Sequence, residues 1–518
     1  MRPPPAKSPF IHIDPQRPDG LQMQIYQAIR RAILDGTVAP GARLSSSRAL
    51  ADDLGVSRTT TLLAYEQLTA EGYLTARHGA GTFVGHELPD DLPVVRAQTT
   101  REASTHPPLS ARGQRLAALP AAARRIPGPP RPFRLGIPAI DRFPHRLWTQ
   151  LATRRLRNAT LAQLDYGDPA GQLPLRTAIA AHVSASRGTT CTADQILIVA
   201  GAQRGLELIA RTLLDAGDEV AIEEPGYPGA WSAFVEAGAT LRPVRVDEHG
   251  LDVATLDRAR TRSPTLAYVT PSHQFPLGVT MSLPRRLALL RWARERGAWI
   301  VEDDYDSEYR YGTRPVPCLH GLAADGRVIY VGTFSKTLFP SLRLGFVIVP
   351  ADLQRAFVAI RSVSDLHPPA IDQLVVADLI ADGHYDRHLR RVRAVCRERL
   401  EALDRAIRRD APGALRLRPV QTGLHAIVDV APDVDLDRLV VEAVANGVEL
   451  MPLSAYVLGR ASAPRAIVLG FGGVDPHAID RGMKNLSRAI DASRGVTPAS
   501  APPARRRARS AIRCRTRE

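Results

Sequence analysis

The sequence has few cysteines, and they follow no pattern. The four are scattered without a CxxC pair, which argues against a disulfide framework or a zinc site: Cys191, Cys318, Cys396 and Cys514. The sequence also lacks an apolar run long enough to cross a bilayer, and its start, Met1 to Pro5, lacks the apolar stretch of a signal peptide. We therefore expect a cytoplasmic protein with no metal site and no membrane partner.

Acidic residues are scarce at the C-terminal end. The chain has 68 Lys and Arg against 53 Asp and Glu, a formal charge of +15. Part of the excess comes from arginines after Arg494 that are matched only by Glu518: Arg505, Arg506, Arg507, Arg509, Arg513, Arg515 and Arg517. Such a tail is predicted to be disordered, and it could bind nucleic acid loosely or remain solvated. Charge alone does not identify the partner.

Composition and periodicity divide the 518 residues into several parts. Between a short N-terminal tail and a basic C-terminal tail, a compact patterned unit is followed by a linker rich in Pro, Ala and Arg and then by alternating strand-like and helical runs. The predicted boundaries are 1–20 for the first tail, 21–85 for the compact unit, 86–131 for the linker, 132–492 for the α/β domain and 493–518 for the last tail.

The compact unit has the pattern of a helix-turn-helix. Apolar residues every four positions predict an amphipathic helix over Leu21–Asp35, and a second helix is expected over Ser47–Leu54. Gly55 then interrupts the chain, and Ser57 is placed to cap a third helix that runs to about Glu71. The predicted apolar face of that third helix is Leu62, Tyr65 and Leu68. Two helices joined by a glycine-containing turn are typical of DNA readers.

The start of the third helix would enter the major groove. It offers short donors and one cation, which suit phosphates and base edges: Ser57, Arg58, Thr59, Thr60 and Thr61. Strand-forming residues around a His-Gly-Ala-Gly turn then predict a small hairpin over residues 73–84, a "wing". The alternative from pattern alone is a three-helix packing module whose Ser-Arg-Thr stretch is only a capped helix start.

In the α/β domain, the strand at residues 328–332 leads into a loop with hydroxyls and one lysine. Pyridoxal phosphate requires a lysine amine for its Schiff base, and its phosphate requires donors and a cation. Lys336 could supply the amine, while Thr333, Ser335 and Arg343 could bind the phosphate. A lone Ser-Lys pair is more often surface decoration.

A second strand end carries acids next to a tyrosine. Asp303 could pair with a protonated pyridinium nitrogen and preserve the ring as an electron sink, and the Tyr305 hydroxyl could bond the phenolic oxygen of the ring. Taken alone, the Asp-Asp-Tyr-Asp run could equally bind a metal or face water.

Two weaker segments complete the candidate site. The turn at Gly201, Ala202 and Gln203 joins a strand to a helix, where exposed N–H groups favour an anion such as the phosphate. Tyr227 lies in a tight turn, where its ring could stack on a flat cofactor or simply pack in the core. Neither segment is specific by itself.

The compact unit resembles the GntR-type winged helix almost throughout. The matching stretches are Pro40 to Arg48, Leu54 to Arg58, Ala64 to Leu68, Glu71 to Leu74 and Gly79 to Val84, with Ser45 where the family usually has proline. The resemblance implies DNA contacts by Arg43, Arg48, Arg58 and Thr60, with Gly81 at the tip of the wing.

The rest of the chain resembles fold-type I aminotransferases, and more closely the MocR/GabR subfamily of GntR regulators. The motifs are Asp165 to Gly171, Glu223 to Gly229, Thr270 to Met281, Glu302 to Tyr311, Thr333 to Gly345 and Gly383 to Arg391. The resemblance implies an α/β fold with a small winged helix-turn-helix and a large aminotransferase-like domain. It also implies that pyridoxal phosphate is held by Lys336, with Asp303, Tyr305 and Arg343 as its partners.

Three departures bear on function. Phe275 stands where aminotransferases commonly have an asparagine, and Ala200 and Ala202 stand where many relatives carry serine. Arg465 is near, but not clearly at, the position of the arginine that holds a substrate carboxylate. We therefore expect a transcription factor, a head-to-tail homodimer on paired DNA half-sites, in which the cofactor or its adduct with an amine or amino acid biases DNA binding.

Two other functions remain open from the sequence. One is an aminotransferase with an attached DNA-binding domain, since nothing in the core excludes transamination half-reactions. The other is a non-catalytic sensor with pyridoxal phosphate itself as the signal.

Overall fold

The computed structural model describes residues 11–77, 80–86, 109–117, 131–258, 263–312, 316–323, 325–458 and 463–494. These residues form two compact units, one before and one after residue 108. The predicted basic tail from residue 495, residues 1–10, most of the linker and two residues of the wing, 78 and 79, lie outside the described residues.

The smaller unit is a three-helix fold with one hairpin. Its elements are α1 (Leu21–Leu34), α2 (Ser47–Leu54), α3 (Arg58–Ala70), β1 (Leu74–Arg77) and β2 (Gly81–Val84). The helices begin and end where capping chemistry predicts, because the Ser57 side chain accepts from the Thr60 N–H and Gly55 ends α2 with φ of 65°. α2 and α3 thus form the predicted helix-turn-helix.

One predicted face of α3 is partly wrong. Tyr65 and Leu68 are buried as expected, but Leu62 is 40% exposed. The buried positions are instead Thr61, Ala64, Tyr65 and Leu68, because the Thr61 hydroxyl donates to the carbonyl of Ser47 at 2.8 Å and brings this side of α3 against α2. Thr61, whose hydroxyl is hydrogen-bonded, is thus buried on this face of α3 in place of the expected Leu62.

The hairpin β1–β2 is antiparallel, with Leu74 opposite Val84 and Arg77 opposite Gly81. The segment before α2 extends it, since the Leu44 N–H donates to the Thr82 carbonyl at 2.9 Å. The predicted wing is therefore tied to the segment that precedes the helix-turn-helix.

The larger unit is built on an eight-stranded sheet in the order β3-β10-β9-β8-β7-β4-β5-β6. Neighbours from β9 to β5 run parallel, while β10 is antiparallel to both β9 and β3. The carboxyl ends of β3, β9, β8, β7 and β4 therefore meet at one edge, where α/β sheets bind their ligands. The strands are β3 (Ile196–Val199), β4 (Glu219–Glu224), β5 (Thr240–Asp247), β6 (Gly250–Leu251), β7 (Leu266–Val269), β8 (Trp299–Asp304), β9 (Val328–Thr333) and β10 (Gly345–Ile348).

Helices pack on the sheet and bury its apolar strands. They are α5 (His145–Arg157), α7 (Leu173–Arg187), α8 (Ala202–Leu213), α9 (Pro228–Glu236), α10 (Leu283–Arg296), α11 (Leu319–Leu322), α12 (Gln354–Ser362) and α13 (Ala370–Ala381). Two short helices, α4 (Ala111–Ala117) and α6 (Leu161–Leu164), contact α9 and α13 respectively. The short helix α4 lies inside the predicted linker and contacts α9, with Arg112 and Glu236 paired at 2.8 Å. That part of the linker is therefore helical, although extended structure was expected. The predicted domain boundaries remain predictions.

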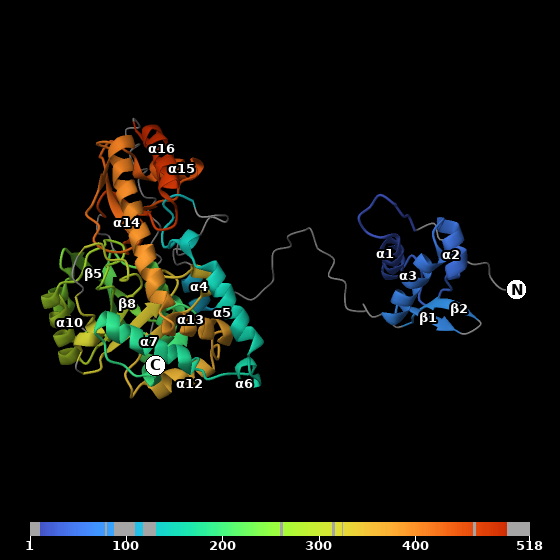
Figure 1. Cartoon of the computed structure of the whole chain (residues 1–518), viewed down its shortest axis with the longest axis horizontal. Helices are drawn as coiled ribbons and strands as arrows, with labels where there is room; N and C mark the ends of the chain where they lie inside the picture. Colours follow the sequence, from blue (N-terminus) through green and yellow to red (C-terminus); the bar gives the residue numbers. More distant parts are fainter. Residues whose placement is uncertain are drawn as a thin grey trace, which may run out of the picture. The chain divides into compact units, whose positions relative to one another are not determined.

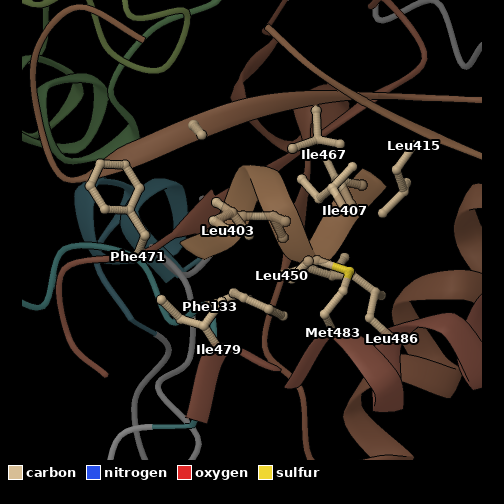
Figure 2. Packing of buried hydrophobic residues seen from close by; sticks show 14 of the residues in the cluster. Phe133, Leu403, Ile407, Leu415, Leu450, Ile467, Phe471, Ile479, Met483 and Leu486 are labelled. Atoms are coloured by element: carbon tan, nitrogen blue, oxygen red, sulfur yellow. The ribbon is translucent and has the colours of Figure 1, made fainter. Parts of the chain in front are cut away.

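A second layer completes the larger unit. It contains the antiparallel sheet β11-β12-β14-β13 and three helices, of which the long α14 runs between this layer and the main sheet (Figure 1). The elements are α14 (His384–Asp410), β11 (Leu415–Leu417), β12 (His425–Val430), α15 (Leu436–Ala445), β13 (Met451–Pro452), β14 (Ala466–Gly470) and α16 (Pro476–Ser493). Figure 2 shows its core, where Leu403 and Ile407 of α14 meet Ile467 of β14 and Met483 of α16.

No helix in the described part of the chain combines the length and apolar character that a membrane span requires.

Candidate functional site

A cavity of about 530 Å³ opens at the carboxyl edge of the main sheet. Nine of the ten predicted cofactor residues line it: Ala202, Gln203, Tyr227, Asp303, Tyr305, Thr333, Ser335, Lys336 and Arg343. The tenth, Gly201, precedes α8 with φ of 89°, and a Cβ on it would lie 3.1 Å from the Arg343 guanidinium. The structure therefore brings together residues from β8, β9, the start of α8 and the loops that follow β4, β8 and β9.

Lys336 is held by contacts on both its side chain and its backbone. Its Nζ donates to the carbonyl of Gly136 at 3.0 Å, and a Cβ on Gly136 would collide with that nitrogen. The Tyr309 hydroxyl donates to the Lys336 carbonyl at 2.7 Å, and the Tyr385 hydroxyl of α14 donates to Thr337 at 2.9 Å. The lysine loop is thus fixed before any ligand arrives.

Asp303 is a buried carboxyl with one oxygen unsatisfied. Its Oδ2 accepts from the Tyr268 hydroxyl at 2.8 Å, whereas its Oδ1 has no partner and is buried. Burial raises the pKa of Asp303 to about 7. A protonated ring nitrogen would supply the missing donor and the missing positive charge, so this side chain fits the role predicted for it.

Backbone and side-chain donors gather at one end of the cavity. α8 begins at Ala202 and presents its first N–H groups there, and Arg343, with φ of 51°, donates to the Ala200 carbonyl at 2.8 Å. The Ser335 N–H donates to the Thr333 hydroxyl at 3.1 Å and so orders the same loop. A helix N-terminus with an arginine and two hydroxyls is suited to a phosphate, although Ala200 and Ala202 bring no hydroxyl of their own.

Tyr227 and Gln203 form a wall of the cavity. The Gln203 amide donates to the Gly229 carbonyl at 3.0 Å, and a Cβ on Gly229 would lie 2.5 Å from the Tyr227 ring. Tyr227 is half-buried and meets Phe275 edge to face, with 5.7 Å between the ring centroids. Its exposed ring surface therefore belongs to the cavity rather than to the closed core.

Tyr305 belongs to a network that sequence reasoning did not assign. Its hydroxyl lies 3.0 Å from Nδ1 of His273, and the same nitrogen lies 2.8 Å from Oδ1 of Asp306. His425, from β12, packs against His273 with 4.8 Å between the ring centroids and 34° between the ring planes, and its Nε2 donates to the Pro276 carbonyl. His273 and Asp306 were inside quoted motifs, but His425 has no local signal because it reaches the site from the second layer.

Arg465 does not reach the cavity. Its guanidinium donates to the carbonyl of Val434 and, at 3.4 Å, to those of Ala431 and Pro432. The sequence left open whether Arg465 could hold a substrate carboxylate. In the structure, Arg465 is not placed to contact a ligand bound at Lys336.

The predicted DNA residues lie on the smaller unit. Arg43, Arg48, Arg58 and Thr59 are exposed, while Thr60 is half-buried and its hydroxyl lies 2.7 Å from that of Ser57. Arg43 and Gly81 come together, since a Cβ on Gly81 would lie 3.0 Å from the Arg43 Nε. Ser57 caps α3, so part of its hydrogen-bonding capacity is already used.

Two family models match the chain. Residues 21–84 match "Bacterial regulatory proteins, gntR family", and residues 144–454 match "Aminotransferase class I and II". The two matches correspond to the helix-turn-helix and to the unit that contains the cavity.

Relatives with both parts are known. The chain is 39% identical to the probable rhizopine catabolism regulatory protein MocR of Rhizobium meliloti, over 92% of this chain and 96% of that protein. It is 33% identical to the pyridoxine biosynthesis transcriptional regulator PdxR of Corynebacterium glutamicum, over 93% and 98%. Among solved structures, LysN, the α-aminoadipate aminotransferase of Thermus thermophilus in complex with N-(5'-phosphopyridoxyl)-L-leucine, is 31% identical and covers 70% of this chain and 92% of its own, with a TM-score of 0.64.

The chain belongs to the GntR-type regulators that carry a class I and II aminotransferase domain, the MocR/GabR type. It is a DNA-binding transcriptional regulator, and its large domain binds pyridoxal phosphate. This confirms the predicted family, fold and cofactor, and it favours the regulator over the aminotransferase with an accessory domain.

The raised pKa of Asp303 makes a prediction for the coenzyme-free protein. A carboxyl whose folded-state pKa exceeds its unfolded value, from 3.8 to about 7, binds its proton more tightly when folded, so the free energy of unfolding falls as pH rises through that window. Asp303→Asn should therefore stabilise the coenzyme-free protein at pH 8 by about 1–4 kcal/mol and have little effect at pH 4. Urea unfolding at the two pH values tests this.

The same Asp303→Asn variant should bind pyridoxal phosphate more weakly, because the negative charge opposite the ring nitrogen is gone. Absorbance titration measures that loss. Equal losses of stability at both pH values would contradict the assignment, since they would indicate a packing defect rather than removal of a buried charge.

A second prediction concerns α3. Arg58→Ala should weaken binding to the DNA upstream of the protein's own gene by about 1–3 kcal/mol, because a base-edge or phosphate contact is lost. Fluorescence anisotropy with a labelled fragment measures this. Arg31→Ala, which removes an exposed arginine of α1, is the matched control and should bind as the wild type does. Equal effects in the two variants would contradict a specific role of Arg58.

Proposed function

We propose that this protein senses an amine or amino acid at the coenzyme pocket and converts its occupancy into a change of affinity for promoter DNA. Lys336 and Asp303 face one cavity, while the candidate carboxylate ligand Arg465 is bonded elsewhere. This observation carries the proposal, because productive transamination needs firm positioning of the substrate carboxylate, whereas sensing needs only differential binding. Because it reads chromosomal DNA, we also propose that it acts in the cytoplasm.

Each residue of the pocket has a proposed role. Lys336 is the attachment point, Asp303 faces the ring nitrogen, Tyr305 faces the phenolic oxygen and Tyr227 packs on the ring. The phosphate is held by the backbone of Gly201, Ala202 and Gln203 together with the side chains of Thr333, Ser335 and Arg343. When bound, pyridoxal phosphate supplies an electrophilic carbon and an electron sink to an incoming amine. The cluster that fixes the lysine loop supports these roles, since a preorganised site loses little entropy on binding.

We further propose a head-to-tail homodimer that reads paired half-sites. Support comes from apolar side chains of α6 and the loop after it that remain uncovered in one chain: Leu161 is 87% exposed, Leu164 is 63% exposed and Tyr166 is 82% exposed. Adjacent exposed apolar residues of this kind mark interaction surfaces. A dimer would also place two copies of α3 on one operator.

The lysine assignment is tested with purified full-length protein. We expect wild type mixed with pyridoxal phosphate to show the absorption band of lysine-bound coenzyme, Lys336→Ala to lack it, and Lys484→Ala, an exposed lysine of α16, to retain it. Footprinting on the DNA upstream of the gene, with and without coenzyme, tests the regulatory part. Borohydride trapping that places the coenzyme on another peptide would overturn the proposal.

The dimer is tested by size-exclusion chromatography with light scattering. The double variant Leu161→Asp/Leu164→Asp should shift the protein from dimer to monomer and weaken binding to a two-half-site operator, because charges enter the proposed interface. Val441→Asp, on an exposed valine of α15, should remain dimeric. A wild type that elutes only as a monomer at micromolar concentration would refute this part.

A further inference from the structure

Part of the cavity lining is apolar. It consists of Leu135, Ile140, Phe275 and Leu424. Behind Leu135 and Phe275 lies a buried cluster that includes Val468 of β14, Leu453 and Tyr456. A ligand that extends from Lys336 toward these four side chains meets hydrocarbon and aromatic surface rather than donors.

The cations of the cavity are already committed. Among the described residues that line it, only Lys336 and Arg343 carry a positive charge. Arg343 lies against Gly201 and Ala200 at the start of α8, where the proposed function places the phosphate. Arg134, next to Leu135 in the sequence, pairs instead with Glu449 at 2.5 Å.

The remaining polar groups do not favour an anion. Asp303 and Asp306 are buried acids of the lining. Burial, and to a lesser extent the negative charge of the nearby Asp303, raises the pKa of Glu223 to about 7. His425 also lines the cavity, but burial and the neighbouring His273 lower its pKa to about 3, so its imidazole is neutral. A carboxylate placed here would lose its hydration without gaining a cation, which is costly in a buried site.

We infer that the effector of this pocket is a primary amine with no carboxylate beside its amino group. The inference rests on the proposed function, because it names the ligand class of the same site. Such a ligand has no carboxylate that would need a cation, and its carbon skeleton matches the apolar lining of Leu135, Ile140, Phe275 and Leu424.

Matched pairs of an amino acid and its decarboxylated amine test the inference directly. The probes are tyrosine and tyramine, leucine and isoamylamine, and arginine and agmatine, each titrated into full-length, coenzyme-loaded protein. The measurements are the change in the coenzyme absorption band and the change in affinity for promoter DNA. We expect at least one amine to reach half-saturation at a concentration at least tenfold below that of its amino acid, with no pair reversed.

Any amino acid that binds more tightly than its amine would overturn the inference, as would the absence of a response to all three amines. These outcomes are separable from failure of the proposed function. If the coenzyme band does not form on Lys336, or promoter DNA is not bound, the proposed function itself fails. If both are present and an amino acid is preferred, only the ligand class is wrong.

A charge introduced at the pocket wall gives an independent test. Leu135 is half-buried and lines the cavity, so Leu135→Arg would bring a guanidinium to the apolar wall. The test uses the pair whose amine binds the wild type most tightly. For the amino acid of that pair, we expect the half-saturating concentration to fall at least tenfold in the arginine variant relative to wild type. Leu135→Gln, of similar length but neutral, should leave the preference for the amine in place. An arginine variant that binds coenzyme normally yet shows the wild-type preference would contradict the inference.

Discussion

The larger unit contains a buried carboxylate that lacks a hydrogen-bond partner for one of its oxygens. The cavity beside this carboxylate therefore favours a ligand that brings a donor or a positive charge. Asp303 lies at the end of β8 with Oδ1 buried and unpartnered. A charge in that position is unfavourable unless a cation or a strong donor is placed against it. Asp303 lines the cavity at this edge of the sheet, and a ring that carries a protonated nitrogen would supply the donor that Oδ1 lacks. Coenzyme binding thus relieves an unfavourable feature that the fold itself creates.

The parallel sheet makes this arrangement available. Because β8 and β9 are adjacent and parallel, with Asp303 opposite Val331, the acid and the loop that carries Lys336 leave the sheet at the same edge. α14 then connects the site to the second layer, since its Tyr385 and His388 both bond Thr337 beside the lysine. The loop that carries Lys336 is therefore in direct contact with a helix that also forms the core of the second layer (Figure 2). These contacts form a continuous physical connection between the cavity and that core.

Much of the site could be predicted because its signals are local. Ser57, Gly55 and the apolar period identify the helix-turn-helix, and the run from Thr333 to Arg343 follows a strand as coenzyme chemistry requires. Residues that reach the site from far along the chain could not be found this way. Gly136 meets Lys336 across 200 positions, and His425 meets Pro276 across 149 positions. Leu62 and Arg465 were uncertain or wrong for a related reason, because the neighbouring element decides which way a side chain faces, and periodicity does not.

The departure from the aminotransferase motif at Phe275 can be explained by the hydrogen bonds around Tyr305. Phe275 stands where aminotransferases commonly have an asparagine whose amide bonds the ring oxygen, so in the proposed arrangement Tyr305 holds that oxygen without it. His273 allows this, because its Nδ1 lies 2.8 Å from a carboxylate oxygen of Asp306 and must carry the proton that the carboxylate accepts. Tyr305, 3.0 Å from the same nitrogen, can then accept from it and keep its own proton for the cavity. The phenylalanine meanwhile contributes apolar wall where a donor would otherwise stand. With the proposed roles, the same substitution leaves the contact with the ring oxygen to the half-buried Tyr305 and adds an apolar side chain to the cavity lining in place of an amide.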